Sequence, residues 1–162
     1  IRSSNPMSRE MAATVCALTG SPNAELQIAL IGCLKDEVPF VRANAAVALA
    51  NIPEHQDQAL AALTDLLSAS DPQLRRMAAA NLGSFGEEAS EQLPKLTAVL
   101  SNDDAEVVTP VIQLLGRMGP TAVEAVPQLQ RIAFEEQGEV KQAAEQALLL
   151  IQAPSDSTPE KK

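Results

Sequence analysis

The chain has 162 residues, enough for one domain with a hydrophobic core, and its formal net charge is −9. Apolar residues make up 46% of it and aromatic residues only 2%, a composition that favours closely packed helices over a β-rich core. The negative charge argues against nucleic acid and anionic membranes as partners, because both are bound through Lys and Arg. The sequence has no apolar run near the roughly 18 residues that a membrane span needs.

The first predicted element is a helix near residues 6–19, and its pattern recurs every 33 residues along the chain. Apolar columns begin at Val41, Ala45, Leu49 and Ile52, spaced by four, four and three residues. This spacing puts one apolar stripe along a helix. The Leu49 column consists of Cys16, Leu49, Leu82, Leu115 and Leu148.

The next predicted element, near residues 23–35, begins another series of helices that alternates with the first one. Its main column has leucine at each of four steps. Each unit is therefore a pair of amphipathic helices, which we call the first helix and the second helix of the unit. At the start of the second helix, Asn or Asp often caps the helix and proline often stands in its first turn. Gly or Pro follows the end of the helix. The leucine column of the first helices is Leu30, Leu63, Leu96 and Leu129.

These patterns predict an all-α fold, a right-handed α–α superhelix of about four and a half helix-pair repeats over residues 1–153. Because the opening unit holds only a second helix, we expect the chain to be cut from a longer array. The polar segment 154–162 is expected to be a disordered tail. Second helices are predicted near 6–19, 39–52, 72–85, 105–118 and 138–152, and first helices near 23–35, 56–68, 89–101 and 122–134.

The units resemble the HEAT repeat, and most closely the bacterial HEAT-like type named after phycobilisome lyases. Pro94 and Pro127 occupy the proline position of that family's first helix, and Asp36 precedes Arg42 by six residues, as the family pattern requires. The resemblance implies a right-handed solenoid stabilised by a ladder of Asp–Arg contacts. The ladder residues carried over from the family are Asp36 with Arg42, Arg75, and, more loosely, Glu135 with Lys141.

One unit departs from the family pattern. Val108 stands where the basic ladder residue belongs, and Pro110 falls inside the predicted second helix. An interior proline removes a hydrogen bond and costs about 3 kcal/mol, so we expect a kink or a late start of this helix. Pro110 is then either a tolerated irregularity of this helix or the cause of a functional bend in the superhelix.

The sequence offers few candidates for catalytic or metal-binding residues. His55 is the only histidine and is expected to be an exposed loop residue, which leaves no other base for a nucleophile–histidine arrangement. Metal-ligand motifs such as CxxC and HExxH are missing from the sequence, and acidic pairs such as Asp103-Asp104 are expected to be solvated turn residues. We expect Cys16 and Cys33 to be buried thiols, and we expect no cofactor, no metal and no enzymatic activity.

The resemblance implies that the second helices line the concave side of the solenoid. A rotation of 100° per residue puts the columns that start at residues 43, 46, 47 and 50 opposite the buried stripe, as a shallow groove. The function expected from this groove is non-catalytic binding or scaffolding of another protein or another segment of the parent protein. The candidate partner-binding residues are Phe40, Val47, Arg76, Ala80, Gln113 and Arg117.

Three alternatives stay open at this point. Other parts of the parent protein could cover the small-residue surface, the chain could be a purely structural spacer, or the family name could point to phycobilin lyase or isomerase activity. The sequence leaves the oligomeric state and the compartment open, with the cytoplasm favoured over the periplasm or secretion.

Overall fold

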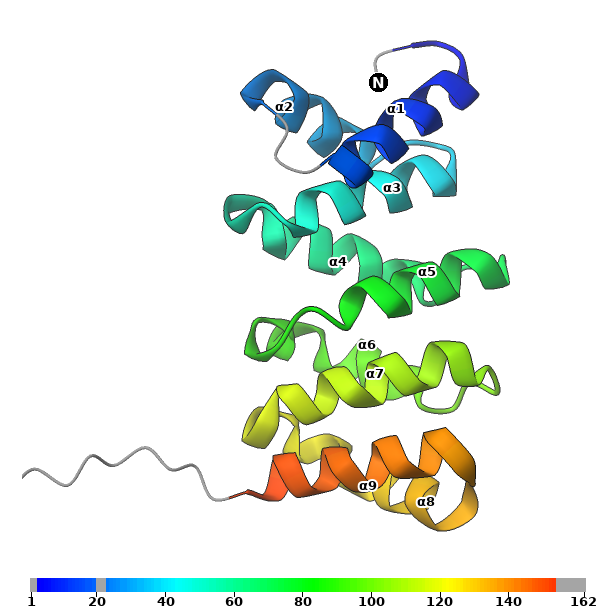
Figure 1. The fold of residues 1–162 in the computed structure, drawn as a ribbon, viewed down its shortest axis with the longest axis vertical. Coiled ribbons are helices and arrows are strands. Elements are labelled where there is room, and N and C mark those ends of the chain that lie inside the picture. Colours follow the sequence, from blue (N-terminus) through cyan, green and yellow to red (C-terminus); the bar gives the residue numbers. More distant parts are fainter. Residues whose placement is uncertain (1–2, 20–22, 154–162) are drawn as a thin grey trace, which may run out of the picture.

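The computed structural model describes residues 3–19 and 23–153, so the predicted tail at 154–162 lies outside the described residues. Within those two ranges the chain is helical and contains no β-strand (Figure 1). Three short 3-10 helices precede α4, α6 and α8. The α-helices are α1 (Pro6–Thr19), α2 (Ala24–Cys33), α3 (Pro39–Ala50), α4 (Gln56–Leu66), α5 (Pro72–Leu82), α6 (Leu93–Val99), α7 (Ala105–Arg117), α8 (Val126–Glu135) and α9 (Gly138–Gln152).

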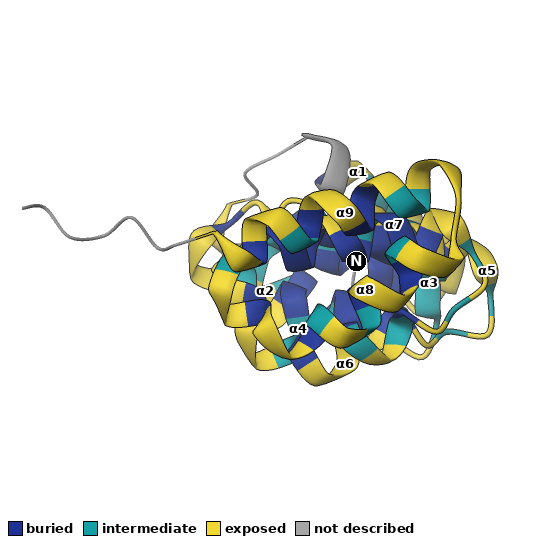
Figure 2. Ribbon diagram, turned by 90° about the horizontal axis from the view of Figure 1, so that it is seen from below, coloured by how far each residue is buried: buried dark blue, intermediate teal, exposed yellow. Residues whose placement is uncertain are grey.

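The helices form two layers. The second helices α1, α3, α5, α7 and α9 lie one after another in the front layer of Figure 1, and the first helices lie behind them. Each second helix contacts the next one and also packs on the first helix of its own unit where that helix is present. Seen along the stack, the buried stretches of the helices lie mainly toward the interior, between the two layers (Figure 2). This arrangement is the predicted solenoid of helix pairs.

The leucine columns of the sequence form its core. Leu30, Leu63, Leu96 and Leu129 are fully buried in the first helices, and Leu49, Leu82 and Leu115 are fully buried in the second helices. A buried leucine stabilises a fold by about 1.5–3 kcal/mol, so these columns account for a large part of the cohesion between units. On α3 the core has two sides, because Val41 packs with α1 and α2 whereas Ala46 packs in the larger cluster that continues through α9.

Two first helices begin later than the sequence predicts. The α6 helix begins at Leu93 rather than near residue 89, and α8 begins at Val126 rather than near residue 122. The residues before them form the 3-10 helices η2 (Glu87–Gln92) and η3 (Gly119–Ala125). Pro94 and Pro127 explain the difference, because a proline fits an α-helix only in its first turn. Ile28 and Ala61 stand at the same repeat position in α2 and α4, and those helices begin earlier.

Helix α7 tolerates its interior proline. It begins at Ala105, in register with the other second helices, and continues through Pro110 to Arg117 as one helix. The late start that Pro110 suggested is therefore wrong. The missing N–H of Pro110 would have bonded to the carbonyl of Glu106, an exposed residue in the first turn, where water can take its place. The Asp104 carboxylate also stabilises this start by accepting the N–H of Glu106 at 3.1 Å.

Candidate partner-binding face

The outer surface of α1, α3, α5, α7 and α9, called here the second-helix face, is narrower than the sequence suggests. Ala43 and Ala46 were predicted to lie on it, but both are fully buried, as are Ala79 and Ile112. Successive second helices contact one another, so these residues pack between neighbouring helices. The column that starts at Val47 is the more open one: Val47 is half-buried, and its equivalents Ala80, Gln113 and Gln146 are exposed.

The structure brings two of the six candidate partner-binding residues together. Gln113 and Arg117, one turn apart on α7, line a cavity of about 180 Å³ between α7 and α9. Phe40 is half-buried on α3, and Arg76 lines a separate cavity near Asp103 and Asp104. The remaining lining of the α7–α9 cavity comes from Gly116, Ala143, Gln146, Ala147 and Leu150.

The Arg117 side chain connects α7 to the end of α5. Its Nε donates to the carbonyl of Phe85 at 3.2 Å. The guanidinium lies close to Gly83, since a Cβ added to that residue would be in van der Waals contact with an Arg117 Nη atom at 3.5 Å. A cation is favoured at this place, because the carbonyls at a helix C-terminus carry partial negative charge. Arg117 is thus exposed but fixed in position.

Arg76 is fixed by acidic residues of the next unit. Its Nε lies 2.9 Å from Asp104 Oδ2, and its Nη1 lies 3.4 Å from a carboxylate oxygen of Glu106. The hydrogen bond from Arg76 is the main reason why the pKa of the Asp104 carboxyl is lowered. The Arg76 guanidinium is therefore already paired with carboxylates. Its main contact is the one between two units, and a contact with a partner comes second.

Three arginines spaced by 33 residues form the polar ladder of this chain, namely Arg9, Arg42 and Arg75. Each Nη1 donates to two backbone carbonyls in the turn before its own helix, five and six residues earlier. The shorter of the two distances is 3.0 Å for Arg9, 2.7 Å for Arg42 and 2.8 Å for Arg75. A second contact, from Nε and Nη2 to the following unit, would connect neighbouring units.

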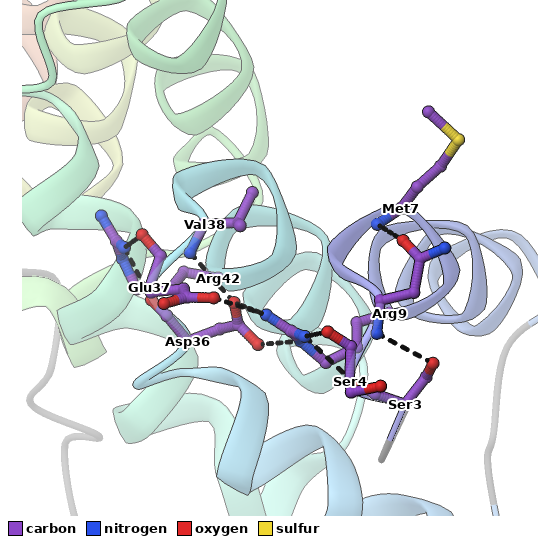
Figure 3. Close-up of polar contacts among 9 residues, drawn as sticks. Ser3, Ser4, Met7, Arg9, Asp36, Glu37, Val38 and Arg42 are labelled. Atoms are coloured by element: carbon purple, nitrogen blue, oxygen red, sulfur yellow. Dashed lines mark hydrogen bonds and ion pairs between the residues drawn. The ribbon is translucent and has the colours of Figure 1, made fainter.

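Only Arg9 completes this second contact with a carboxylate among the described residues. Its Nε and Nη2 donate to the two oxygens of Asp36 at 2.6 Å and 3.0 Å, and Nη2 also reaches Glu37 at 3.3 Å (Figure 3). The Arg9 and Asp36 side chains are only 13% and 9% exposed. The hydrogen bonds from Arg9 are the main cause of the lowered pKa of the Asp36 carboxyl.

Of the ladder pairs expected from the family pattern, Asp36 and Arg42 are in contact through the backbone of Asp36, whereas no ion pair joins Glu135 to Lys141 among the described residues. Arg42 donates to the carbonyl of Asp36 rather than to its carboxylate, and the carboxylate pairs with Arg9 of the preceding unit. Lys141 lies 3.9 Å from Glu145, one turn away on α9, instead of pairing with Glu135. The reason is that Arg42 binds its own turn through Nη1, whereas the Asp36 carboxylate is bound by Nε and Nη2 of Arg9 from the preceding unit. Sequence reasoning missed Arg9, although it lies one period before Arg42.

The remaining side chains with reactive chemistry are His55, Cys16 and Cys33. His55 ends the 3-10 helix Pro53–His55 and is half-buried rather than exposed. Cys16 and Cys33 are buried and not bonded to each other, and burial raises the pKa of the Cys33 thiol. In residues 3–19 and 23–153 no group of His, Cys, Asp and Glu side chains is arranged to hold a metal ion. Over the same ranges, no helix is both long and apolar enough to cross a membrane.

A two-layer stack of repeated helix pairs defines an α-solenoid repeat protein. The family model for HEAT repeats matches residues 1–81 and 60–149, and the chain belongs to this family. No curated protein matches it. The finer resemblance to the phycobilisome-lyase type stays a prediction.

Solved structures of repeat proteins share the fold. An engineered protein from a structural genomics consortium superposes with a TM-score of 0.69 at 25% identity, over 93% of this chain and 77% of that chain. A second engineered protein gives 0.67 at 25% identity, over 93% of this chain and 75% of that one. A designed armadillo repeat protein in complex with the peptide (KR)4 gives 0.70 at 22% identity, over 92% of this chain and 77% of that chain.

Proposed function

We propose that this chain is a non-catalytic interaction module that holds a partner protein on its second-helix face. The observation that carries the proposal is the α7–α9 cavity, where the exposed Gln113 and Arg117 adjoin apolar groups. Leu150 in the cavity wall is 46% exposed, and the neighbouring Leu149 is 74% exposed. Arginine beside open apolar surface is the combination that typically anchors a protein interface.

Two further facts support a binding role. HEAT and armadillo-like repeats generally serve as scaffolds for protein interactions, and the designed armadillo relative was solved with a bound peptide. The fixed position of Arg117, through its contact with the Phe85 carbonyl, means that a partner would lose little side-chain entropy by contacting it.

A pull-down with a matched pair of variants tests this proposal. Gln113→Arg puts a long charged side chain into the cavity, and Gln130→Arg makes the same change at an exposed position of α8 in the other layer. We expect wild type and Gln130→Arg to retain the same specific partner from the native host, and Gln113→Arg to lose it. Equal retention by both variants would refute binding at this face.

A further inference from the structure

Helix α1 carries an exposed apolar stripe at one end of the stack (Figure 1). Met7, Met11 and Val15 are spaced by four residues, so they lie along one side of the helix, and they are 70%, 66% and 54% exposed. No large apolar residue is exposed between positions 29 and 122, all of which the structure describes. Apolar side chains gathered on one side of a helix mark an interaction surface. We call these three residues the α1 stripe.

The repeat shows which surface the α1 stripe represents. Met11 and Val15 precede Ala143 and Ala147 of α9 by four periods of 33 residues. Both alanines are buried and line the cavity between α7 and α9, and a Cβ added to Gly116 of α7 would lie 3.0 Å from Ala147 Cα. On α9 this side therefore packs against the preceding second helix. The α1 stripe is the same side of the first helix in the stack.

The opposite end of the stack is polar at the corresponding place. Glu145 of α9 stands where the inner second helices have Ala46, Ala79 and Ile112, which are fully buried between neighbouring helices. The Glu145 side chain is 55% exposed, and a polar outer face is typical of the unit that ends a solenoid. A head-to-tail stack of two copies would bury this carboxylate against the α1 stripe, which is unfavourable. The occupant of the stripe is therefore not the α9 end of another copy.

Charge favours contact between two α1 helices. The chain has a formal net charge of −9, but α1 contains only one cation, Arg9, and one anion, Glu10, so its own formal charge is zero. The Arg9 side chain is bound to Asp36, and the Met7 side chain extends away from both of them (Figure 3). Methionine is flexible and polarisable, so it adapts to an irregular apolar partner surface. Two copies of an acidic chain can thus meet at α1 with little repulsion.

We propose that the α1 stripe is covered by the α1 stripe of a second copy of this chain, in a dimer with two-fold symmetry. Each inner second helix is covered on this side by another second helix, so the α1 helix of a second copy continues an interface that the chain already uses. Two-fold symmetry places Met11, the middle residue of the stripe, opposite Met11 of the second copy. The polar α9 ends then point outward, and the dimer is closed.

The contact is expected to be weak. One helix from each copy gives a smaller interface than the standard one, which buries about 800 Å² per partner. We therefore expect a dissociation constant in the micromolar range rather than the nanomolar range. The dimer does not depend on the α7–α9 cavity, so it stands or falls separately from the proposed partner binding.

Sedimentation equilibrium tests the dimer. We expect the mass to rise with concentration from that of the 17.1 kDa chain toward twice that value and to stop there. Met11→Glu enters the interface twice, so it should weaken the dimer by at least about tenfold. Phe134→Glu makes the same kind of change on α8, at a residue that is 89% exposed, and should leave the dimer unchanged. Circular dichroism establishes that each variant remains folded.

Cysteine crosslinking tests the symmetry. Because Met11 faces its own copy, Met11→Cys should form a disulfide-linked dimer when copper phenanthroline and air oxidise the two thiols, whereas Phe134→Cys should not. The native Cys16 and Cys33 are buried, so wild type should stay uncrosslinked. A wild-type chain that stays monomeric, or a dimer that Met11→Glu leaves intact, would overturn the proposal. A dimer in which Met11→Cys does not crosslink, or assemblies that grow beyond two copies, would overturn the two-fold contact through α1.

Discussion

The contact between α7 and α9 makes a quantitative prediction for Gly116→Ala. Gly116 is the penultimate residue of α7, and a Cβ added there would lie 3.0 Å from Ala147 Cα and 3.2 Å from Ala147 Cβ. The Leu150 Cδ1 atom, at 3.3 Å, can rotate away, but Ala147 Cα belongs to the backbone of α9. Relief of the contact therefore requires α9 as a whole to move away from α7.

Gly32→Ala is the matched control. Gly32 is the penultimate residue of α2, and a Cβ added there meets nothing within 4 Å. Alanine is favoured over glycine in a helix by about 0.5–1 kcal/mol, so Gly32→Ala should stabilise the protein by that amount. At Gly116 the same gain is set against an overpacking cost of about 1–3 kcal/mol. We expect Gly116→Ala to lower the free energy of unfolding by about 0.5–2 kcal/mol.

Urea unfolding followed by circular dichroism measures both variants, with a shared m-value as the condition for comparing their midpoints. For a chain of this size, 1 kcal/mol corresponds to about 2–4 °C in Tm, which thermal unfolding can resolve. If Gly116→Ala proves as stabilising as Gly32→Ala, α7 and α9 are not in the close contact described, and the packing of the last unit is wrong.

Three further predictions concern the core, the ladder and the thiols. Leu115→Ala, at a fully buried position, should cost about 2–5 kcal/mol in urea unfolding, whereas Leu149→Ala, at an exposed position, should change stability by less than about 0.5 kcal/mol; similar losses would contradict the assigned core. Because Arg9 lowers the pKa of Asp36, this carboxylate stabilises the fold above its unfolded-state pKa, near 4, and stops doing so as the pH falls through its lower folded-state pKa. Arg9→Gln should raise the Asp36 pKa in a carboxyl-carbon NMR titration, and an unchanged value would exclude the ion pair. Cys16 and Cys33 are buried, so a thiol reagent should label them slowly in native protein and rapidly in urea; equal rates would show that the N-terminal units are open.

The sequence predicted the helix pairs because their signal is redundant. Each apolar column repeats at four or five positions, and the buried Leu49, Leu82 and Leu115 mark one helix face in three units. The starts of α6 and α8 were missed because the periodic pattern extends over residues that Pro94 and Pro127 exclude from an α-helix. Apolar periodicity records which side of a helix is buried, whereas proline decides where its hydrogen bonding begins.

The candidate face was less predictable, because a helical wheel treats a helix as if only one side were covered. In the stack α3 contacts α1, α4 and α5 as well as α2, so Ala43 and Ala46 are buried although they lie away from the main stripe. The ladder was missed for a related reason. Its ion pair joins Arg9 to Asp36 of the next unit, and spacing inside one unit cannot show which unit supplies the partner.

Site-specific photocrosslinking tests the proposed binding face most directly. A photoreactive amino acid replaces either Gln113 on α7 or Gln130 on α8, and the chain is irradiated in the native host. Both positions are exposed, and they lie on different layers. The proposal predicts a discrete crosslinked partner from position 113 and none from position 130. A partner captured from position 130 alone would contradict the assignment of the second-helix face.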